Sequence, residues 1–220
     1  MALPWRDFQK DWWENMVTLL ENGPAEGPRF LFAHGAGAPM DSPWMERMAG
    51  LLAEGGVRVI RFEFAYMAAR RAGKRAPPPR MEKLLDEFRA VISQLGPGPL
   101  AIGGKSMGGR AASLIADEMR AQGLARKLVV FGYPFHPAGK PEETRTAHLG
   151  ALVTPMVIFQ GERDALGAKD EVKAYALSNK IRLTWLADGD HDLKPRVASG
   201  HTWKENMTLA AARAAEFIRA

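Results

Sequence analysis

The sequence predicts an α/β fold with a mostly parallel central sheet and helices on both faces. Apolar runs of strand length alternate along the chain with segments of helical periodicity, which is typical of strands joined by crossover helices. Loops rich in glycine or charge follow several of these runs, as expected at the carboxyl ends of parallel strands. The length of 220 residues suits one domain spanning residues 1–220.

The predicted elements follow from local signals in chain order. The first helix begins after Ser42 or Asp41 near its N-cap, with Pro43 near its first turn. Residues 1–28 are ambiguous, because the region around Trp12 fits either an amphipathic helix or an irregular edge. The predicted strands are 29–33, 57–64, 99–102, 127–131, 156–160 and 181–186. The predicted helices are 44–54, 81–95, 106–119, 168–178 and 202–219.

A G-x-S-x-G motif lies where the strand 99–102 runs into a helix, with Gly104, Ser106 and Gly108 as its fixed positions. This is the pattern of a nucleophile elbow, in which the serine takes a positive φ and projects its hydroxyl from a sharp turn. A Cβ two residues to either side would collide with that turn, so glycine is required there. The alternative is a glycine-rich turn that serves packing alone.

Two other binding motifs are incomplete in this sequence. A phosphate-binding P-loop ending at Lys105 would need glycine at position 99, which is Pro99. A calcium loop beginning at Asp188 would need glycine and glutamate where the chain has Leu193 and Ser199. We therefore expect neither a nucleotide nor a metal at these positions.

The composition is that of an ordinary globular protein, with 46% hydrophobic and 25% charged residues. The absence of cysteine excludes disulfides, a cysteine nucleophile and thiolate metal sites. Residues 1–15 have no apolar signal region, and the longest uncharged run, 146–161, is too short to span a membrane. We expect a soluble, cytoplasmic protein with no membrane partner.

The net charge of +5 is concentrated in one predicted loop, 65–81, which holds five basic residues and no acidic one. Nucleic-acid-binding proteins usually spread their basic residues over a face or a helix, so no nucleic-acid partner is expected. The loop is either solvated or a local site for an anion. In the second case Arg70 and Arg71 would attract an anionic substrate, with Tyr66 nearer the pocket.

Ser106, Asp164 and His191 follow three predicted strands in the chain order of α/β-hydrolases. His191 would take the proton of Ser106, and Asp164 would orient the imidazole. Backbone N–H groups of Met107 and of the loop at Ala36 would bind the developing oxyanion.

Each of these roles has an alternative. Asp164 could instead cap the helix expected near residue 168, and His191 could be a surface histidine. His136, in a proline-rich loop that could border the pocket, is the best substitute and a candidate substrate contact. His34, which ends a strand, is expected to bond the loop backbone.

Five segments together resemble a small α/β-hydrolase group related to dienelactone hydrolases, which includes the testis-expressed hydrolase-like proteins and the hydrolase-like subunit of a nonspecific-lethal chromatin complex. They are HGAG at 34–37, FEFAYMAARR at 62–71, GGKSMGGR at 103–110, GERD at 161–164 and GDHDL at 189–193. The resemblance runs from about Arg29 to the C-terminus and implies the α/β-hydrolase fold with a triad of Ser106, Asp164 and His191. Dienelactone hydrolases use a cysteine nucleophile where this chain has serine.

The sequence therefore predicts a serine hydrolase that cleaves a carboxylic ester or thioester through an acyl-serine intermediate, with no metal or cofactor. The connection 134–150 is too short for a multi-helix lid, which predicts a minimal cap and an open site. The alternative is a catalytically weak or inactive interaction module of hydrolase shape, with the basic loop as its docking surface.

Overall fold

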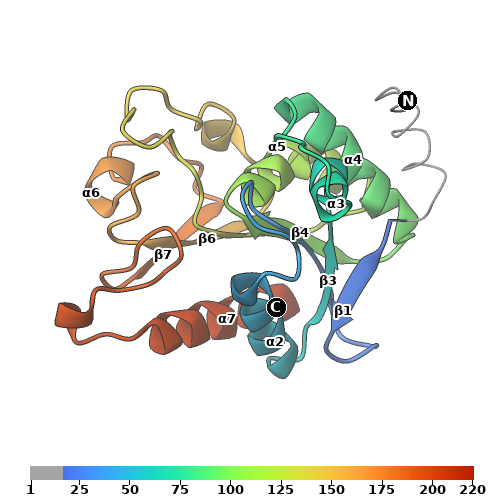
Figure 1. The fold of residues 1–220 in the computed structure, drawn as a ribbon, viewed down its shortest axis with the longest axis horizontal. Helices are drawn as coiled ribbons and strands as arrows, with labels where there is room; N and C mark the ends of the chain where they lie inside the picture. Colours follow the sequence, from blue (N-terminus) through green and yellow to red (C-terminus); the bar gives the residue numbers. More distant parts are fainter. Residues whose placement is uncertain (1–16) are drawn as a thin grey trace.

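The computed structural model describes residues 17–220, which form a seven-stranded sheet with helices on both faces (Figure 1). The strands are β1 (Leu19–Asn22), β2 (Arg29–Ala33), β3 (Arg58–Phe62), β4 (Leu100–Lys105), β5 (Lys127–Phe131), β6 (Met156–Gly161) and β7 (Ile181–Leu186). The helices are α2 (Pro43–Glu54), α3 (Ala65–Arg71), α4 (Met81–Gln94), α5 (Met107–Ala121), α6 (Lys169–Val172) and α7 (Trp203–Arg219), with short 3₁₀ turns at Leu149–Ala151 and Val197–Ser199.

The sheet has the strand order β1-β3-β2-β4-β5-β6-β7, and all neighbours are parallel except the pair β1 and β3. Because the strands from β2 to β7 are parallel, the loops after β2, β4, β6 and β7 lie at one edge of the sheet. The predicted α/β fold is confirmed by this topology.

Alternating side chains of the strands fill two hydrophobic cores. On β2, Leu31 faces the core beneath α3, α4 and α5, whereas Phe30 and Phe32 face the core beneath α2 and α7. Figure 1 shows these two groups of helices on opposite faces of the sheet. Two-sided burial explains why the central strands read as continuous apolar runs in the sequence.

Two helical predictions need correction. The predicted basic loop begins as helix α3, whose residues Tyr66, Met67 and Ala69 are buried against the core. The helix predicted over 168–178 is the single turn α6, which ends at Val172. At the end of the predicted stretch, the N–H of Ser178 donates to Leu149 O and its hydroxyl donates to Leu152 O, so tertiary hydrogen bonds hold this residue outside a helix.

The other boundaries differ by few residues. The β4 ladder extends past the predicted strand because Gly103 and Gly104 still pair with β2 and β5. Part of the ambiguous N-terminal segment forms β1, and the region around Trp12 lies outside the described residues. Between β5 and β6 the chain forms only a 3₁₀ turn, so the predicted minimal cap is confirmed.

A buried carboxyl group joins α4 to the start of α3. Glu87 Oε2 accepts a hydrogen bond of 2.9 Å from Ala65 N–H, whereas Oε1 is buried without a partner among the described residues. Burial raises the pKa of Glu87 from 4.5 to about 7. The folded protein therefore binds this proton more tightly than the unfolded chain, and the charged form opposes folding.

We expect Glu87→Gln to stabilise the protein above neutral pH and to leave it nearly unchanged in acid. As pH rises from 4.5 to about 7, the protonated carboxyl of the wild type loses its proton. The free energy of unfolding then falls by at most about 3 kcal/mol. Urea unfolding at several pH values measures the difference. The control Glu82→Gln, exposed on the same helix, should give no gain in alkaline buffer. A gain for Glu87→Gln that does not change with pH would contradict the assignment.

Candidate active site

The turn from β4 into α5 holds Ser106 in a strained backbone conformation. Its φ of 50° and ψ of −115° lie outside the regions that L-residues usually adopt. A Cβ at Gly104 would lie 2.6 Å from Ala33 O, and one at Gly108 would lie 2.5 Å from His34 O. A Cβ at Gly104 would also lie 2.6 Å from Gly108 C, which is the predicted clash within the turn, whereas the clashes at Gly108 are with the end of β2.

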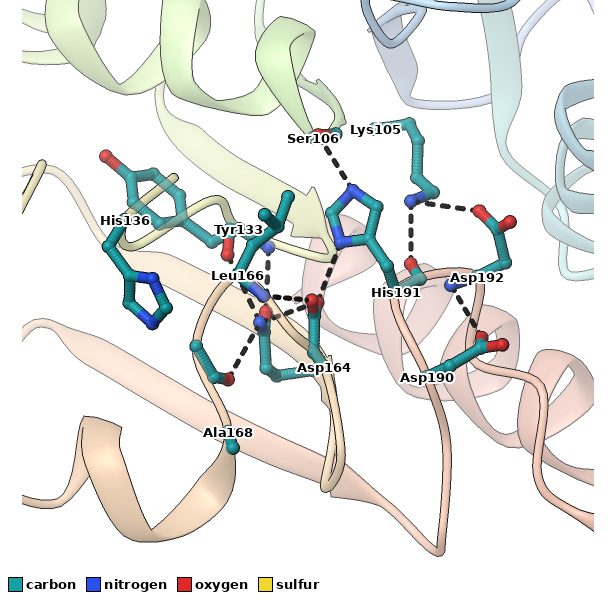
Figure 2. A network of polar contacts seen from close by, with 12 residues as sticks. Lys105, Ser106, Tyr133, His136, Asp164, Leu166, Ala168, Asp190, His191 and Asp192 are labelled. Atoms are coloured by element: carbon teal, nitrogen blue, oxygen red, sulfur yellow. Dashed lines mark hydrogen bonds and ion pairs between the residues drawn. The ribbon is translucent and has the colours of Figure 1, made fainter. Parts of the chain in front are cut away.

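Three side chains from separate loops form a chain of hydrogen bonds. His191 Nε2 lies 2.9 Å from Ser106 Oγ, and His191 Nδ1 lies 2.8 Å from Asp164 Oδ2. Figure 2 shows the His191 ring between the other two side chains. Asp164 is fully buried, while the His191 side chain is 29% exposed. The structure thus brings together the three residues that the sequence singled out.

Asp164 is oriented by hydrogen bonds other than the one to His191. Its Oδ1 accepts from Leu166 N–H at 2.9 Å, and its Oδ2 also accepts from the buried Gln160 Nε2 at 2.8 Å. Asp164 does not cap α6, because the N-cap of this helix is Ala168, whose N–H donates to Glu171 Oε2. The carboxylate can only accept, so His191 donates from Nδ1 and its Nε2 is free to accept from the serine hydroxyl.

The loop that carries His191 is fixed by charged neighbours. Asp190 Oδ1 accepts from the N–H groups of Asp192 and Lys194 at 2.8 and 2.9 Å, so it folds the loop rather than facing the imidazole. Lys105 Nζ donates to His191 O at 2.7 Å and pairs with Asp192 Oδ1 at 3.2 Å (Figure 2). Burial lowers the pKa of the Lys105 ammonium. Lys105, inside the motif itself, therefore anchors the histidine loop.

A cavity of about 350 Å³ opens beside Ser106. Its size is in the range of small-molecule sites. The lining is mostly apolar, with two arginines among it. The lining residues are Ala36, Pro79, Met81, Leu84, Ser106, Met107, Arg110, Pro134, Arg145 and Leu166.

A family model described as an alpha/beta hydrolase domain matches residues 26–219. The chain belongs to this family. No curated protein sequence matches the hydrolase chain.

Solved structures share the hydrolase fold at low sequence identity. Est1E from Butyrivibrio proteoclasticus, solved with ferulic acid, is 15% identical over 93% of this chain and 96% of its own, with a TM-score of 0.64. XC6422 from Xanthomonas campestris, described as a serine hydrolase without a lid, is 16% identical over 92% and 89%, with a TM-score of 0.62. The thioesterase domain from the curacin biosynthetic pathway is 16% identical over 91% and 94%, with a TM-score of 0.63. At these identities the likeness concerns the fold.

The loop after β2 lies beside Ser106. A Cβ built at Gly35 would be 3.7 Å from Ser106 Cβ, and Ala36 and Met107 both line the cavity. The buried Tyr66 hydroxyl donates to Ala36 O at 3.0 Å. His34 bonds the loop backbone as expected, with Nδ1 2.6 Å from Gly35 O. Burial lowers the pKa of His34, which keeps its ring neutral.

The four side chains predicted to contact substrate are absent from the cavity lining. Tyr66 is buried, and Arg70 donates to Ala76 O at 2.6 Å with its guanidinium over the Tyr66 ring. Arg71 pairs with Asp41 and Glu63, both at 3.0 Å or less. His136 is buried, with Nδ1 2.8 Å from Pro137 O and Nε2 3.2 Å from Glu171 Oε2.

Sequence reasoning missed four residues around the site. Gln160 and Lys105 support Asp164 and His191, and Arg110 and Arg145 line the cavity. Gln160 is a polar residue in an otherwise apolar strand, which is a signal that could have found it. Arg110 lies four residues after Ser106, one helical turn along the same face.

Two further observations concern metals and membranes. Residues 17–220 contain no cluster of three or more His, Cys, Asp or Glu side chains that could hold a metal ion. Over the same residues, no helix is both long enough and apolar enough to cross a membrane.

Proposed function

We propose that this protein is a serine hydrolase that cleaves a carboxylic ester or thioester through an acyl-serine intermediate. The observation that carries the proposal is the hydrogen-bonded chain from Ser106 through His191 to the buried Asp164, on a strained elbow beside a cavity. A serine hydroxyl is a weak nucleophile until a base takes its proton, and this chain supplies both a base and a group that orients it.

In the proposed reaction, Ser106 Oγ attacks the acyl carbon while His191 Nε2 takes the hydroxyl proton. Asp164 stabilises the resulting imidazolium. The carbonyl oxygen becomes an oxyanion, which the N–H groups of Ala36 and Met107 would bind. The alcohol or thiol leaves with the proton from His191. Water then attacks the acyl-serine with the same histidine as base, releasing the acid and free Ser106.

Two observations, one on the cavity and one on similar structures, favour an enzyme over an interaction module. The cavity beside Ser106 is open, since the connection between β5 and β6 forms no helical cap over it. The comparison structures include the esterase domain of a Rhodothermus marinus protein and a thioesterase domain. We further propose that the chain falls in the hydrolase group related to dienelactone hydrolases, on the segments quoted above, with serine in place of the cysteine nucleophile.

A fluorophosphonate probe tests this proposal without a known substrate, because it modifies only an activated serine. We expect stoichiometric labelling that peptide mapping places on Ser106. Absence of labelling, or labelling elsewhere in the chain, would leave the hydrolase reaction without support.

A glycine next to His191 provides a geometric test. Gly132 has a φ of +65°, and a Cβ there would lie 2.9 Å from His191 O and 3.2 Å from its Nδ1. We expect Gly132→Ala to displace the imidazole and to lower kcat for an activated ester by at least ~10-fold.

Gly139→Ala is the matched control for this prediction. Gly139 has a similar φ of +71°, but a methyl group added there would have no atom within 4 Å. Both variants should lose a similar amount of stability from backbone strain. Equal ester hydrolysis by the two variants would show that the space beside His191 is unimportant.

A further inference from the structure

We propose that Arg110 and Arg145 form an anion-binding subsite beside Ser106, and that the substrate is an ester or thioester with a carboxylate on its acyl part. The inference rests on the proposed function, because it assigns a substrate class to the same site. It differs from the sequence prediction, which gave this role to Arg70 and Arg71.

Arg110 is placed beside the nucleophile by the geometry of α5. Ser106 is the N-cap of this helix, and Arg110 N–H donates to Ser106 O at 3.0 Å. Residues four apart lie on one face of a helix, so the Arg110 side chain stands one turn from the serine hydroxyl. Both residues line the cavity. The N-terminus of the same helix adds positive potential at Ser106.

Arg145 reaches the cavity from the connection between β5 and β6. Its backbone is held on both sides, since its N–H donates to Phe135 O at 2.7 Å and its carbonyl accepts from the Tyr133 hydroxyl at 3.0 Å. Tyr133 is fully buried, which makes it a rigid support. The backbone that carries the second guanidinium is therefore fixed, and Arg145 lines the cavity.

Neither guanidinium forms an ion pair within residues 17–220. Arg110 Nε is buried and has no hydrogen-bond partner among those residues. Glu143, the acidic residue with an electrostatic influence on Arg145, pairs with Lys140 at 2.6 Å. By contrast, Arg71 and Arg89 are each paired with two carboxylates. The two cavity arginines are thus available to an anion.

The two positive charges also affect each other. Burial, followed by the charge of Arg110, lowers the pKa of Arg145. The neighbouring His148 adds no third positive charge, because burial and the charge of Arg110 lower its pKa. The Tyr133 hydroxyl, which interacts with the side chains of Arg110 and Ser113, is neutral, because burial raises its pKa to about 12. An anion between the guanidinium groups would relieve this repulsion and accept charge-assisted hydrogen bonds from both.

The apolar residues of the cavity lining indicate which group joins the scissile carbonyl of the substrate to its carboxylate. Met81, Leu84 and Leu166 present apolar surface to the cavity. A hydrocarbon segment between the scissile carbonyl and the carboxylate would contact these side chains while its charged end meets the arginines. Half-esters or thioesters of dicarboxylic acids have this chemistry.

The test compares para-nitrophenyl hemiadipate with para-nitrophenyl hexanoate, in which a methyl group replaces the carboxylate. We expect the wild type to prefer the hemiadipate in kcat/KM. In the double variant Arg110→Gln/Arg145→Gln, kcat/KM for the hemiadipate should fall at least ~30-fold, and the ratio of this kcat/KM to that for the hexanoate should fall at least ~10-fold. The preference should also shrink as ionic strength rises.

Two matched controls remove a positive charge elsewhere. Arg120→Gln lies on the same helix at its exposed end, and Arg70→Gln removes an arginine named by the sequence prediction. Both should keep the preference for the hemiadipate. A wild type without this preference, or an equal loss on both esters in the double variant, would overturn the inference.

Binding of adipate itself separates this inference from the proposed function. Saturation-transfer NMR should detect adipate on the wild type and on Ser106→Ala, but not on the double arginine variant, whose fold is checked by its melting temperature. If neither ester is hydrolysed but adipate binds in this pattern, the proposed function fails and the subsite stands. If the hexanoate is hydrolysed and adipate does not bind, the subsite fails alone.

Discussion

Ser106→Ala should lower hydrolysis of a short activated ester by at least ~10³-fold, because the members of a catalytic triad act as a unit. The hydroxyl of Ser106 lies 2.9 Å from His191 Nε2, so its removal leaves the base without a nucleophile to activate. The same change should abolish labelling by a fluorophosphonate probe. Initial rates with para-nitrophenyl acetate, together with mass spectrometry of the labelled protein, measure both effects.

Ser93→Ala is a suitable control for this prediction. Its hydroxyl donates to Arg89 O at 3.1 Å on α4 and contacts no residue of the candidate site. We expect wild-type rates and full labelling at Ser106 in that variant. Turnover by Ser106→Ala within a few-fold of the wild type would remove the serine-hydrolase proposal, whatever the result with the arginine variants.

Strong local signals made most of the fold predictable from sequence. The predicted strands 127–131 and 181–186 have the bounds observed for β5 and β7, since β5 is a buried apolar run and β7 alternates apolar with polar residues. The elbow was predictable because the G-x-S-x-G pattern is local in the sequence, although the crowding at Gly108 comes from the distant strand β2. The short length of α6 was not predictable, because the stretch after it is held at Ser178 by carbonyl groups that lie 26 and 29 positions earlier in the chain.

Part of the candidate site could also be predicted from the sequence, and part of it could not. Ser106, Asp164 and His191 stand at strand ends in a known chain order, so sequence could suggest their meeting. The charges around them could not be assigned, because pairing between distant residues decides which cations remain available. Arg71 belongs to a conspicuous basic run, yet Asp41 and Glu63 neutralise it from other elements. Arg145 is inconspicuous in sequence, yet no carboxylate among residues 17–220 pairs with it.

Asp164→Asn should lower kcat/KM for the same ester by about 10³- to 10⁴-fold while leaving the fold intact. The carboxylate accepts from three donors: Leu166 N–H, Gln160 Nε2 and His191 Nδ1. An asparagine has only one acceptor oxygen. If that oxygen faces Leu166, its NH₂ group points at Gln160 and at the imidazole. His191 must then carry its proton on Nε2, where it can no longer accept from Ser106.

Asp190→Asn provides the matched control, since it removes a charge one residue from His191 but keeps an oxygen for the N–H groups of Asp192 and Lys194. Its rates should stay within ~10-fold of the wild type, because surface charges contribute little to an internal proton transfer. NMR of the imidazole nitrogens should show the Nε2–H tautomer in Asp164→Asn and the Nδ1–H tautomer in Asp190→Asn. Similar losses in both variants would mean that the loss reflects nearby negative charge rather than the tautomer that Asp164 imposes on His191.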